Sequence, residues 1–422
     1  MISAARAAYT GLLGLLLPYA LGRLAWRSRR EPGYRRNLAE RFGFYPRSRE
    51  DATSPLIWVH AVSVGETRAA EPLVRALQRR YPDHRILLTH MTPTGRRAGE
   101  TLFGEGVQRC YLPYDFPGAV GRFLDHFQPR LGVLLETEIW PNLIHACKAR
   151  DLPLFLVNAR LSEKSYRGYR RFGALTRPSI AGLTAIAAQA SDDAQRLSAL
   201  GAREVAVTGN IKFDVAPPVD QLELGRMWRE GYGARGVLLA ASTREGEERL
   251  VLNAYALLPP APLLVIVPRH PQRFDEVAAL LERRGLRYER RSTGRAISAE
   301  TQVLLGDSMG EMPAYYAACD VAFIGGSLLP YGAHNFIEAC AIGTPVLLGP
   351  HTYNFAQAAE QAIASGAARR VANAEDLARV AGRLLKDGDM RAGMSQHALE
   401  FSRTHQGATE RIMAMLERFV RQ

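Results

Sequence analysis

The stretch Trp58-Val59-His60-Ala61-Val62-Ser63-Val64-Gly65-Glu66 passes from apolar residues through a run of small residues to a carboxylate. The apolar run at residues 56–60 is typical of a buried strand, and the pattern of residues 67–80 predicts an amphipathic helix. A strand that leads through a short loop into a helix is the repeating unit of a parallel α/β fold. The stretch therefore predicts this fold class and places Glu66 near the start of a helix.

The same unit of strand, loop and helix recurs along most of the chain. The predicted buried strands of the first half lie at residues 56–60, 85–89, 107–112, 131–135, 153–157 and 205–208, and those of the second half at 237–241, 263–267, 302–305, 321–324 and 345–348. Because the rhythm breaks at residues 214–218, we expect two Rossmann-like domains facing a cleft, with ligands at the carboxyl ends of the strands. The expected division is 1–30 for an N-terminal anchor segment, 31–214 for the first domain and 215–422 for the second.

The composition is that of a globular, basic protein. Apolar residues make up 47% of the 422 residues and charged residues 23%, which excludes a disordered or fibrous chain. The formal charge of +12 indicates an anionic partner, which nucleic acid, a membrane or a phosphorylated substrate would each satisfy. The four cysteines form no C-x-x-C pair, so the sequence favours a reducing compartment over a disulfide framework or a thiolate zinc site.

The N-terminal segment is apolar and is followed by arginines. No charged side chain occurs from Ala7 to Gly22, and a basic collar follows, formed by Arg23, Arg27, Arg29, Arg30, Arg35, Arg36 and Arg41. Sixteen uncharged residues are fewer than the roughly 20 that span a bilayer, although flanking arginines can lengthen the insert. We expect a membrane anchor, spanning or in-plane, with its collar on the anionic cytoplasmic leaflet. The alternatives are a buried N-terminal helix and a signal peptide, for which no small-x-small cleavage site is present.

Polar clusters follow several strands of the first half. Glu66 alone has a simple explanation, because an acid in the first turn favours the helix dipole, but the position also suits a general base. Three further clusters, at residues 136–142, 158–162 and 209–214, follow other strands and are expected at the same sheet edge. The last cluster contains Lys212, one of only four lysines beside 50 arginines, which is consistent with a need for a compact cation.

The second half carries the pattern of a nucleotide pocket. Residues 325–340 form a glycine-rich loop and a short helix expected to open near His334 and Asn335, where backbone N–H groups can meet a phosphate. Glu338 lies one turn further and can accept hydrogen bonds from a ribose diol. The segments 267–271 and 306–312 follow other strands and face the same edge. Without these segments, such a loop could as well simply turn the chain.

As an ordered set, these motifs resemble the Kdo (3-deoxy-D-manno-octulosonic acid) transferases of lipopolysaccharide assembly. That family consists of inverting, metal-independent glycosyltransferases with the two-domain GT-B fold. The resemblance covers nearly the whole chain, through the anchor and the segments 34–43, 60–66, 136–142, 158–162, 209–214 and 349–355.

The resemblance implies a role for each candidate residue. Glu66 would be the general base that takes a proton from a hydroxyl of the lipid A precursor, lipid IVA, and Glu136 and Lys212 would stabilise the transition state. The CMP of the donor substrate CMP-Kdo would lie against Arg269, His270, Gly310, Glu311, Met312, Asn335 and Glu338. The family implies no cofactor, no metal and no nucleic acid, and a location on the cytoplasmic face of the inner membrane. The D-x-D triplet at residues 387–389 is interpreted as a turn.

Some residues of the glycine-rich loop depart from the family pattern. Tyr331 stands where a more polar or basic residue is expected, Ala333 where a glycine is expected, and Phe336 where a proline or a small residue is expected. These differences concern how the donor sugar is held, and the number of Kdo residues transferred is left open. Two other functions compete with the transferase: a sugar-nucleotide epimerase of the same fold and a membrane-attached nucleotide-binding scaffold.

Overall fold

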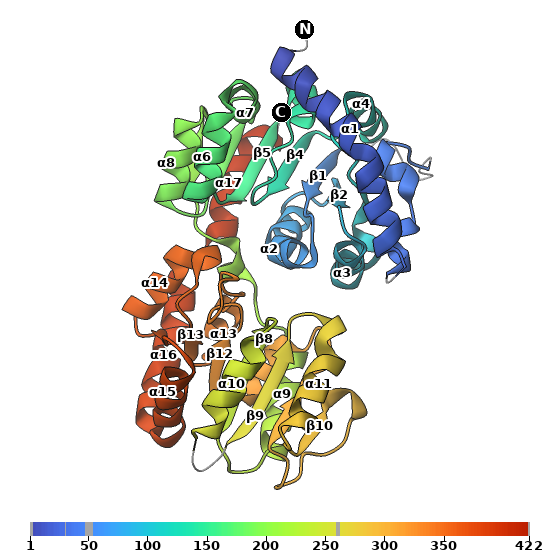
Figure 1. Cartoon of the computed structure of the whole chain (residues 1–422). Helices are drawn as coiled ribbons and strands as arrows, with labels where there is room; N and C mark the ends of the chain where they lie inside the picture. Colours follow the sequence, from blue (N-terminus) through green and yellow to red (C-terminus); the bar gives the residue numbers. More distant parts are fainter. Residues whose placement is uncertain (1–2, 30, 47–53, 259–261, 421–422) are drawn as a thin grey trace. The chain divides into compact units, whose positions relative to one another are not determined.

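The computed structural model describes residues 3–29, 31–46, 54–258 and 262–420. The chain divides into two compact units: the first comprises Met1–Val215 and Gln406–Gln422, and the second comprises Ala216–His405. Each unit contains one parallel seven-stranded sheet with helices on its faces (Figure 1). The structure defines each unit by itself, so the cleft expected between them stays a prediction.

The first sheet has the strand order β3-β2-β1-β4-β5-β6-β7. Its strands are β1 Leu56–His60, β2 Arg85–His90, β3 Gln108–Tyr111, β4 Leu131–Leu135, β5 Leu154–Ala159, β6 Ala185–Ala188 and β7 Val205–Val207. Its helices are α2 Val64–Arg80, α3 Pro93–Phe103, α4 Pro117–Phe127, α5 Pro141–Lys148, α6 Glu163–Arg171, α7 Gly173–Ile180 and α8 Ser191–Ala199. The strand order reverses between β1 and β4, which is where doubly wound sheets bind ligands.

The second sheet has the order β10-β11-β9-β8-β12-β13-β14 and reverses between β8 and β12. Its strands are β8 Val237–Thr243, β9 Leu263–Pro268, β10 Tyr288–Arg290, β11 Val303–Leu305, β12 Val321–Ile324, β13 Val346–Leu348 and β14 Ala368–Arg370. Its helices are α9 Val219–Gly231, α10 Glu247–Ala256, α11 Phe274–Arg283, α12 Met312–Ala318, α13 Ile337–Ile342, α14 Ala356–Ala364, α15 Ala374–Lys386 and α16 Gly388–Thr404.

Every predicted strand is present, but three strands were not predicted. β6 is Ala-Ile-Ala-Ala, too poor in β-branched residues to stand out, and β10 and β14 are short edge strands with charged residues. The expectation that the strand at 205–208 is buried is wrong, because β7 lies at the edge of its sheet and Val207 is 49% exposed.

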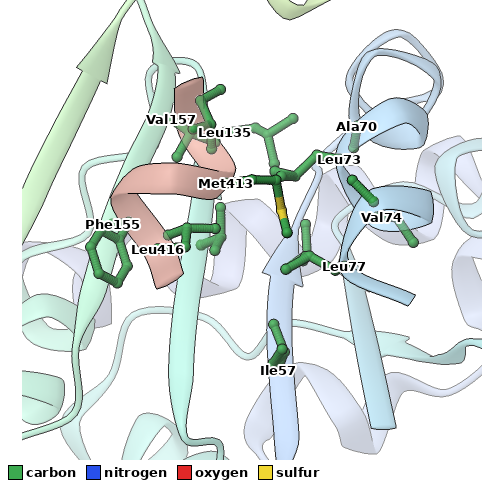
Figure 2. Close-up of a cluster of buried hydrophobic side chains, with 14 of the residues drawn as sticks. Ile57, Ala70, Leu73, Val74, Leu77, Leu135, Phe155, Val157, Met413 and Leu416 are labelled. Carbon is green, nitrogen blue, oxygen red and sulfur yellow. The ribbon is translucent and has the colours of Figure 1, made fainter. Parts of the chain in front are cut away.

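The C-terminal helix α17 Ala408–Val420 belongs to the first unit, although the sequence assigned residues 215–422 to the second domain. Met413 and Leu416 of α17 lie among buried side chains of α2, β1, β4 and β5 (Figure 2). Asp214 holds the start of this helix, because its carboxylate accepts hydrogen bonds from the backbone N–H groups of Gly407 and Thr409, both at 2.6 Å. A helical period predicts an apolar face but not which of two sheets that face covers.

The N-terminal segment forms the helix α1 Ala4–Arg27, which is long and apolar enough to cross a membrane. None of its residues is buried, so the alternative of a buried core helix is wrong. Arg41 is not part of an exposed basic collar, because its side chain is buried. Its guanidinium lies over the ring of Tyr111, at 4.2 Å from the ring centroid. Arg30 lies outside the described residues.

Candidate active site

Glu66 lies in the first turn of α2, immediately beyond the loop that follows β1. Its carboxylate accepts hydrogen bonds from the backbone N–H of Val62 at 2.6 Å and from the hydroxyl of Ser63 at 3.2 Å. Ser63 is the N-cap residue, but its own side chain makes no capping hydrogen bond. Glu66 therefore does stabilise the helix start, as its simple explanation holds, and the question is whether it does more.

The ionisation of Glu66 sets it apart from an ordinary capping acid. Burial, followed by the charges of Glu136 and Glu138, raises the pKa of Glu66 from its ordinary value of 4.5 to about 7, although the two hydrogen bonds oppose this rise. A carboxylate that is partly ionised near neutral pH combines a basic site with a strong tendency to accept a proton. Such a group is suited to general base catalysis.

Glu136 and Lys212 form an ion pair beside this carboxylate. Glu136 follows β4, Lys212 lies in the 3-10 helix η4 Ile211–Asp214, and their Oε1 and Nζ atoms are 2.7 Å apart. Each side chain is about one-fifth exposed. The structure therefore brings the three predicted catalytic residues, Glu66, Glu136 and Lys212, to the carboxyl ends of the strands of one sheet.

Two residues next to the site have a left-handed backbone conformation that is uncommon outside glycine. Glu136 has φ 60° and Asn158, at the end of β5, has φ 53°. Asn158 is fully buried, and its Oδ1 accepts a hydrogen bond from the N–H of Ile211 at 3.1 Å, which fixes the segment that carries Lys212. Strained backbone of this kind clusters at functional sites, where surrounding contacts enforce it.

Glu138 and Trp140 complete the wall of the site. The indole Nε1 of Trp140 donates to Glu138 at 2.5 Å, and its ring meets that of His60 edge to face, with the centroids 6.0 Å apart. Burial raises the pKa of Glu138 and lowers that of His60 to about 3, so this histidine is neutral. Glu138 and Asn158 lie within predicted polar clusters, but the only signal for them was that a carboxylate or amide directly follows a strand.

In the second unit, basic side chains gather after β8 and β9. Nε2 of His270 lies 2.9 Å from Nη1 of Arg244, and because a guanidinium only donates, this nitrogen accepts and the ring is neutral. Burial lowers the pKa of His270, and the charges of Arg244 and Arg269 add to this effect. His334 lies in the loop that follows β12. Burial lowers its pKa to about 3, together with the charges of the same two arginines. These charges can receive an anionic group without making either histidine a cation.

The glycine-rich loop is held from within the protein. Glu247, at the start of α10, is fully buried and accepts hydrogen bonds from the N–H groups of Gly326 at 2.5 Å and Leu328 at 3.1 Å. The helix α13 opens at Ile337, not near His334, and the N–H of Ile337 donates to Oδ1 of Asn335 at 3.2 Å. The helix expected to open near His334 and Asn335 thus begins two residues after Asn335, and the side chain of Asn335 accepts from its first N–H group.

The remaining predicted nucleotide-binding residues lie after β11 and at the start of α13. The amide of Asn335 donates to Glu338 at 3.0 Å. Gly310 has φ 91°, which favours glycine, and Met312 is the first residue of α12. Glu311 pairs with Nη2 of Arg291 at 2.9 Å, and its carboxylate also accepts from the hydroxyl of Ser308.

The sequence relatives identify the family. The family described as 3-deoxy-D-manno-octulosonic-acid transferase (kdotransferase) matches residues 36–215, and that of glycosyl transferases group 1 matches residues 251–401. A 3-deoxy-D-manno-octulosonic acid transferase from Bordetella pertussis is 48% identical over 410 residues, which cover 93% of this chain and 94% of that protein. The chain belongs to the Kdo transferase family. The resemblance of its motifs to this family is thereby confirmed.

Two further comparisons support the family and the fold of this Kdo transferase. A 3-deoxy-D-manno-octulosonic acid transferase from Haemophilus influenzae is 38% identical over 425 residues, 98% of each chain. The structure of UDP-GlcNAc 2-epimerase from Neisseria meningitidis matches with a TM-score of 0.60 at 15% identity, covering 86% of this chain and all of that one. The second likeness concerns the fold alone. The predicted GT-B glycosyltransferase fold is confirmed.

The departures from the family pattern have clear structural positions. Ala333 has φ 66° and is buried, so it occupies a conformation that favours the glycine expected there. Phe336 is fully buried, 5.8 Å from the ring of Phe355 between centroids. The ring of Tyr331 lies under the guanidinium of Arg244, at 4.6 Å, so the aromatic residue positions one of the basic side chains.

The cavity and the D-x-D triplet in the described part of the chain contain none of the predicted site residues of this transferase. A cavity of about 530 Å³ opens beside the edge strand β14, and its lining includes Arg369, Arg370, Arg379 and Arg383 but no predicted site residue. Within the described part of the chain, no group of three or more histidine, cysteine or acidic side chains could hold a metal ion. Asp387 of the D-x-D triplet caps α16 by accepting from the N–H of Met390 at 2.9 Å.

Proposed function

We propose that this Kdo transferase transfers Kdo from CMP-Kdo to a hydroxyl group of a lipid A precursor, lipid IVA, with inversion at the anomeric carbon and with Glu66 as general base. The observation that carries the proposal is the carboxylate of Glu66, whose pKa is raised to about 7 by burial and by two acidic neighbours. A first-turn acid that only stabilised its helix would have no reason to lie beside Glu136 and Glu138.

In the proposed reaction, Glu66 accepts the proton of the attacking hydroxyl as its oxygen bonds to the anomeric carbon. The bond from that carbon to the phosphate oxygen breaks on the opposite face, and CMP leaves with the electron pair. Lys212 and Glu136 stabilise the transition state, because a fixed ion pair presents charge without reorganising. General base catalysis typically contributes about 10²–10⁴ in rate.

The second unit would hold the donor. Glu338 can accept hydrogen bonds from the ribose diol, and Asn335 fixes its carboxylate from one side. Arg269 and His270 lie at the end of β9, where positive charge and a neutral imidazole suit the phosphate and the sugar carboxylate. Gly310, Glu311 and Met312 form the turn into α12, which would contact the cytosine.

The proposal needs no metal and no cofactor, because CMP-Kdo is the donor substrate and arginine and lysine side chains supply the positive charge. It also places the protein on the cytoplasmic face of the inner membrane, where α1 would hold it near its lipid acceptor. The net charge of +12 favours the same anionic surface. No nucleic acid is needed as a partner.

The test is a transfer reaction with the purified full-length chain, CMP-Kdo and a tetraacylated lipid A precursor in the presence of chelator, followed by mass spectrometry. We expect the product in wild type and in the control variant Glu71→Gln, which changes another acid of α2, and its mass counts the sugars added. Glu66→Gln should yield essentially none. No product from folded wild type, with an authentic transferase active in parallel, would overturn the proposal in favour of an epimerase or a scaffold.

A further inference from the structure

One side of α1 lies along the first unit over most of the helix. Its partly covered positions are 5, 6, 9, 10, 13, 17, 20 and 24, a spacing of three to four residues that marks a single helix face. The helix contacts α5, α7 and the segment Pro32–Arg35. A helix that is docked in this way is part of the unit and not a free tether.

The docked side is held by polar side chains. The hydroxyl of Tyr9 donates to Oδ2 of Asp115 at 3.0 Å, and the amide of Asn142 donates to the hydroxyl of Thr10 at 3.0 Å. Asp115 and Asn142 are each only 3% exposed. Buried polar groups of this kind are costly to leave unpaired, so they oppose any movement of α1 away from the unit.

The opposite side of α1 is apolar and open. Its exposed large side chains include Leu12, Leu15, Leu16 and Tyr19, of which Leu15 is 81% exposed. A helix at a protein–water boundary has the reverse arrangement, with polar residues outside and apolar residues inside. The exposed Arg23, Arg27 and Arg29 then follow at its end, as expected for contact with anionic lipid.

Asp115, which contacts α1, is also connected to the active site. Asp115 accepts hydrogen bonds from the backbone N–H groups of Asn142 at 3.0 Å and Leu143 at 2.8 Å, so it caps α5. The N-cap residue of α5, Trp140, contributes no capping side chain of its own. The segment that leads into α5 carries Glu136 and Glu138, and Glu136 pairs with Lys212. One carboxylate thus joins the membrane-facing helix to the segment that carries the site.

We propose that α1 lies in the plane of the membrane surface without spanning it, and that Asp115 is a positioning residue that fixes this lipid-facing helix relative to the carboxylates of the active site. A spanning α1 would have to withdraw Tyr9 and Thr10 from Asp115 and Asn142. The kinetic part of this inference rests on the proposed function; the orientation of α1 does not.

The orientation is tested by labelling single cysteines in membrane vesicles with a membrane-impermeant maleimide. Ser3→Cys and Ala25→Cys place thiols at the two ends of α1, both at exposed positions, and the wild-type chain, with Cys110, Cys147 and Cys340 buried, gives the background. An in-plane helix gives labelling of both positions from the cytoplasmic side alone. Labelling of the Ser3→Cys variant only from the opposite side would overturn the inference, whatever the enzymatic activity.

The positioning role is tested with Tyr9→Phe, which removes one hydroxyl and keeps the ring. Tyr288→Phe is the matched control, because that hydroxyl also donates to a carboxylate, Glu282, at 2.8 Å, but lies in the second unit. With acceptor in phosphatidylethanolamine–phosphatidylglycerol vesicles, Tyr9→Phe should raise the acceptor KM roughly tenfold, the effect of losing a hydrogen bond to a charged group. The KM for CMP-Kdo should not change.

A water-soluble, deacylated acceptor separates positioning from a general structural defect. For that acceptor, Tyr9→Phe should equal wild type, because no membrane surface presents it. An equal loss on both acceptors, or no loss on vesicles, would overturn the positioning role. Wild-type turnover in the same assay tests the proposed function separately.

Discussion

Glu66 and Glu247 occupy corresponding places in the two units, yet the structure uses them differently. Each lies in the first turn of the helix that follows the first strand of its sheet, β1 in one unit and β8 in the other. Glu247 is fully buried and accepts from four backbone N–H groups, those of Arg244, Gly326, Leu328 and Leu329. Glu66 accepts from one backbone N–H and one hydroxyl, and faces two other acids.

The difference shows what separates a structural carboxylate from a chemical one. Burial raises the pKa of both groups, but the hydrogen bonds to Glu247 commit its oxygens to holding the glycine-rich loop. The oxygens of Glu66 have fewer partners, and Glu136 and Glu138 make its proton affinity high. The number and kind of neighbours, not the position in the fold, decides the role.

The largest expected effect is on the activity of Glu66→Gln. If Glu66 is the base, kcat should fall about 10²–10⁴-fold, while the chain stays folded. Because the pKa of Glu66 is raised from 4.5 to about 7 on folding, ionisation of Glu66 destabilises the folded protein, and stability falls as pH rises through this window. Glu66→Gln should therefore be at least as stable as wild type at pH 8, as measured by thermal unfolding. If Glu66→Gln kept the kcat of wild type, Glu66 would not be the base, and its role would not differ from the structural role of Glu247.

Glu247→Gln should have the opposite profile. Its new amide would face backbone N–H groups, so we expect a loss of roughly 2–3 kcal/mol in the free energy of unfolding, the scale of hydrogen bonds to a charged group. Urea unfolding measures this loss in free energy. Glu245→Gln is the control, because Glu245 is a neighbouring acid outside this network of backbone N–H donors. An unfolding free energy equal to that of wild type would contradict the structural role of Glu247.

The pH dependence of the reaction sharpens the comparison further. The acidic limb of kcat/KM should reflect the pKa of Glu66 near 7, because a protonated carboxyl cannot accept a proton. Glu136→Gln removes a negative charge that raises the pKa of Glu66, and this change favours ionised Glu66. The limb should therefore move to lower pH, even where kcat is reduced. A limb that stays in place, or moves to higher pH, would mean that another group controls it.

The sequence was sufficient for the fold class and for the location of Glu66, because both depend on local patterns. A strand, a small-residue loop and a helix are visible within some 25 residues, and parallel strands bring their carboxyl ends together. The destination of α17 was not predictable, since its apolar face fits either sheet. The role of Glu247 was also not predictable, because it depends on contacts distant in the sequence. Its partners in the loop at Gly326–Leu329 lie some 80 residues away.

The donor loop shows the same limit at a single residue. From the family pattern, a glycine is expected at Ala333, and the structure gives the physical reason, a buried backbone with φ 66°. The pattern alone could not say whether the loop had changed its conformation to suit alanine. The structure places Ala333 in the left-handed region, so the alanine carries strain.

The smallest expected effect concerns this strain. Ala333→Gly should raise the free energy of unfolding by about 1 kcal/mol, because an L-residue pays roughly 1–2 kcal/mol for the left-handed region and glycine loses part of this gain through the entropy of the unfolded chain. Ala358→Gly, inside the right-handed helix α14, should lower it by about the same amount. Opposite signs in urea unfolding would establish that the second unit stores strain in the donor loop, as the first unit does at Glu136 and Asn158. Equal losses in both variants would show that the loop is relaxed around alanine.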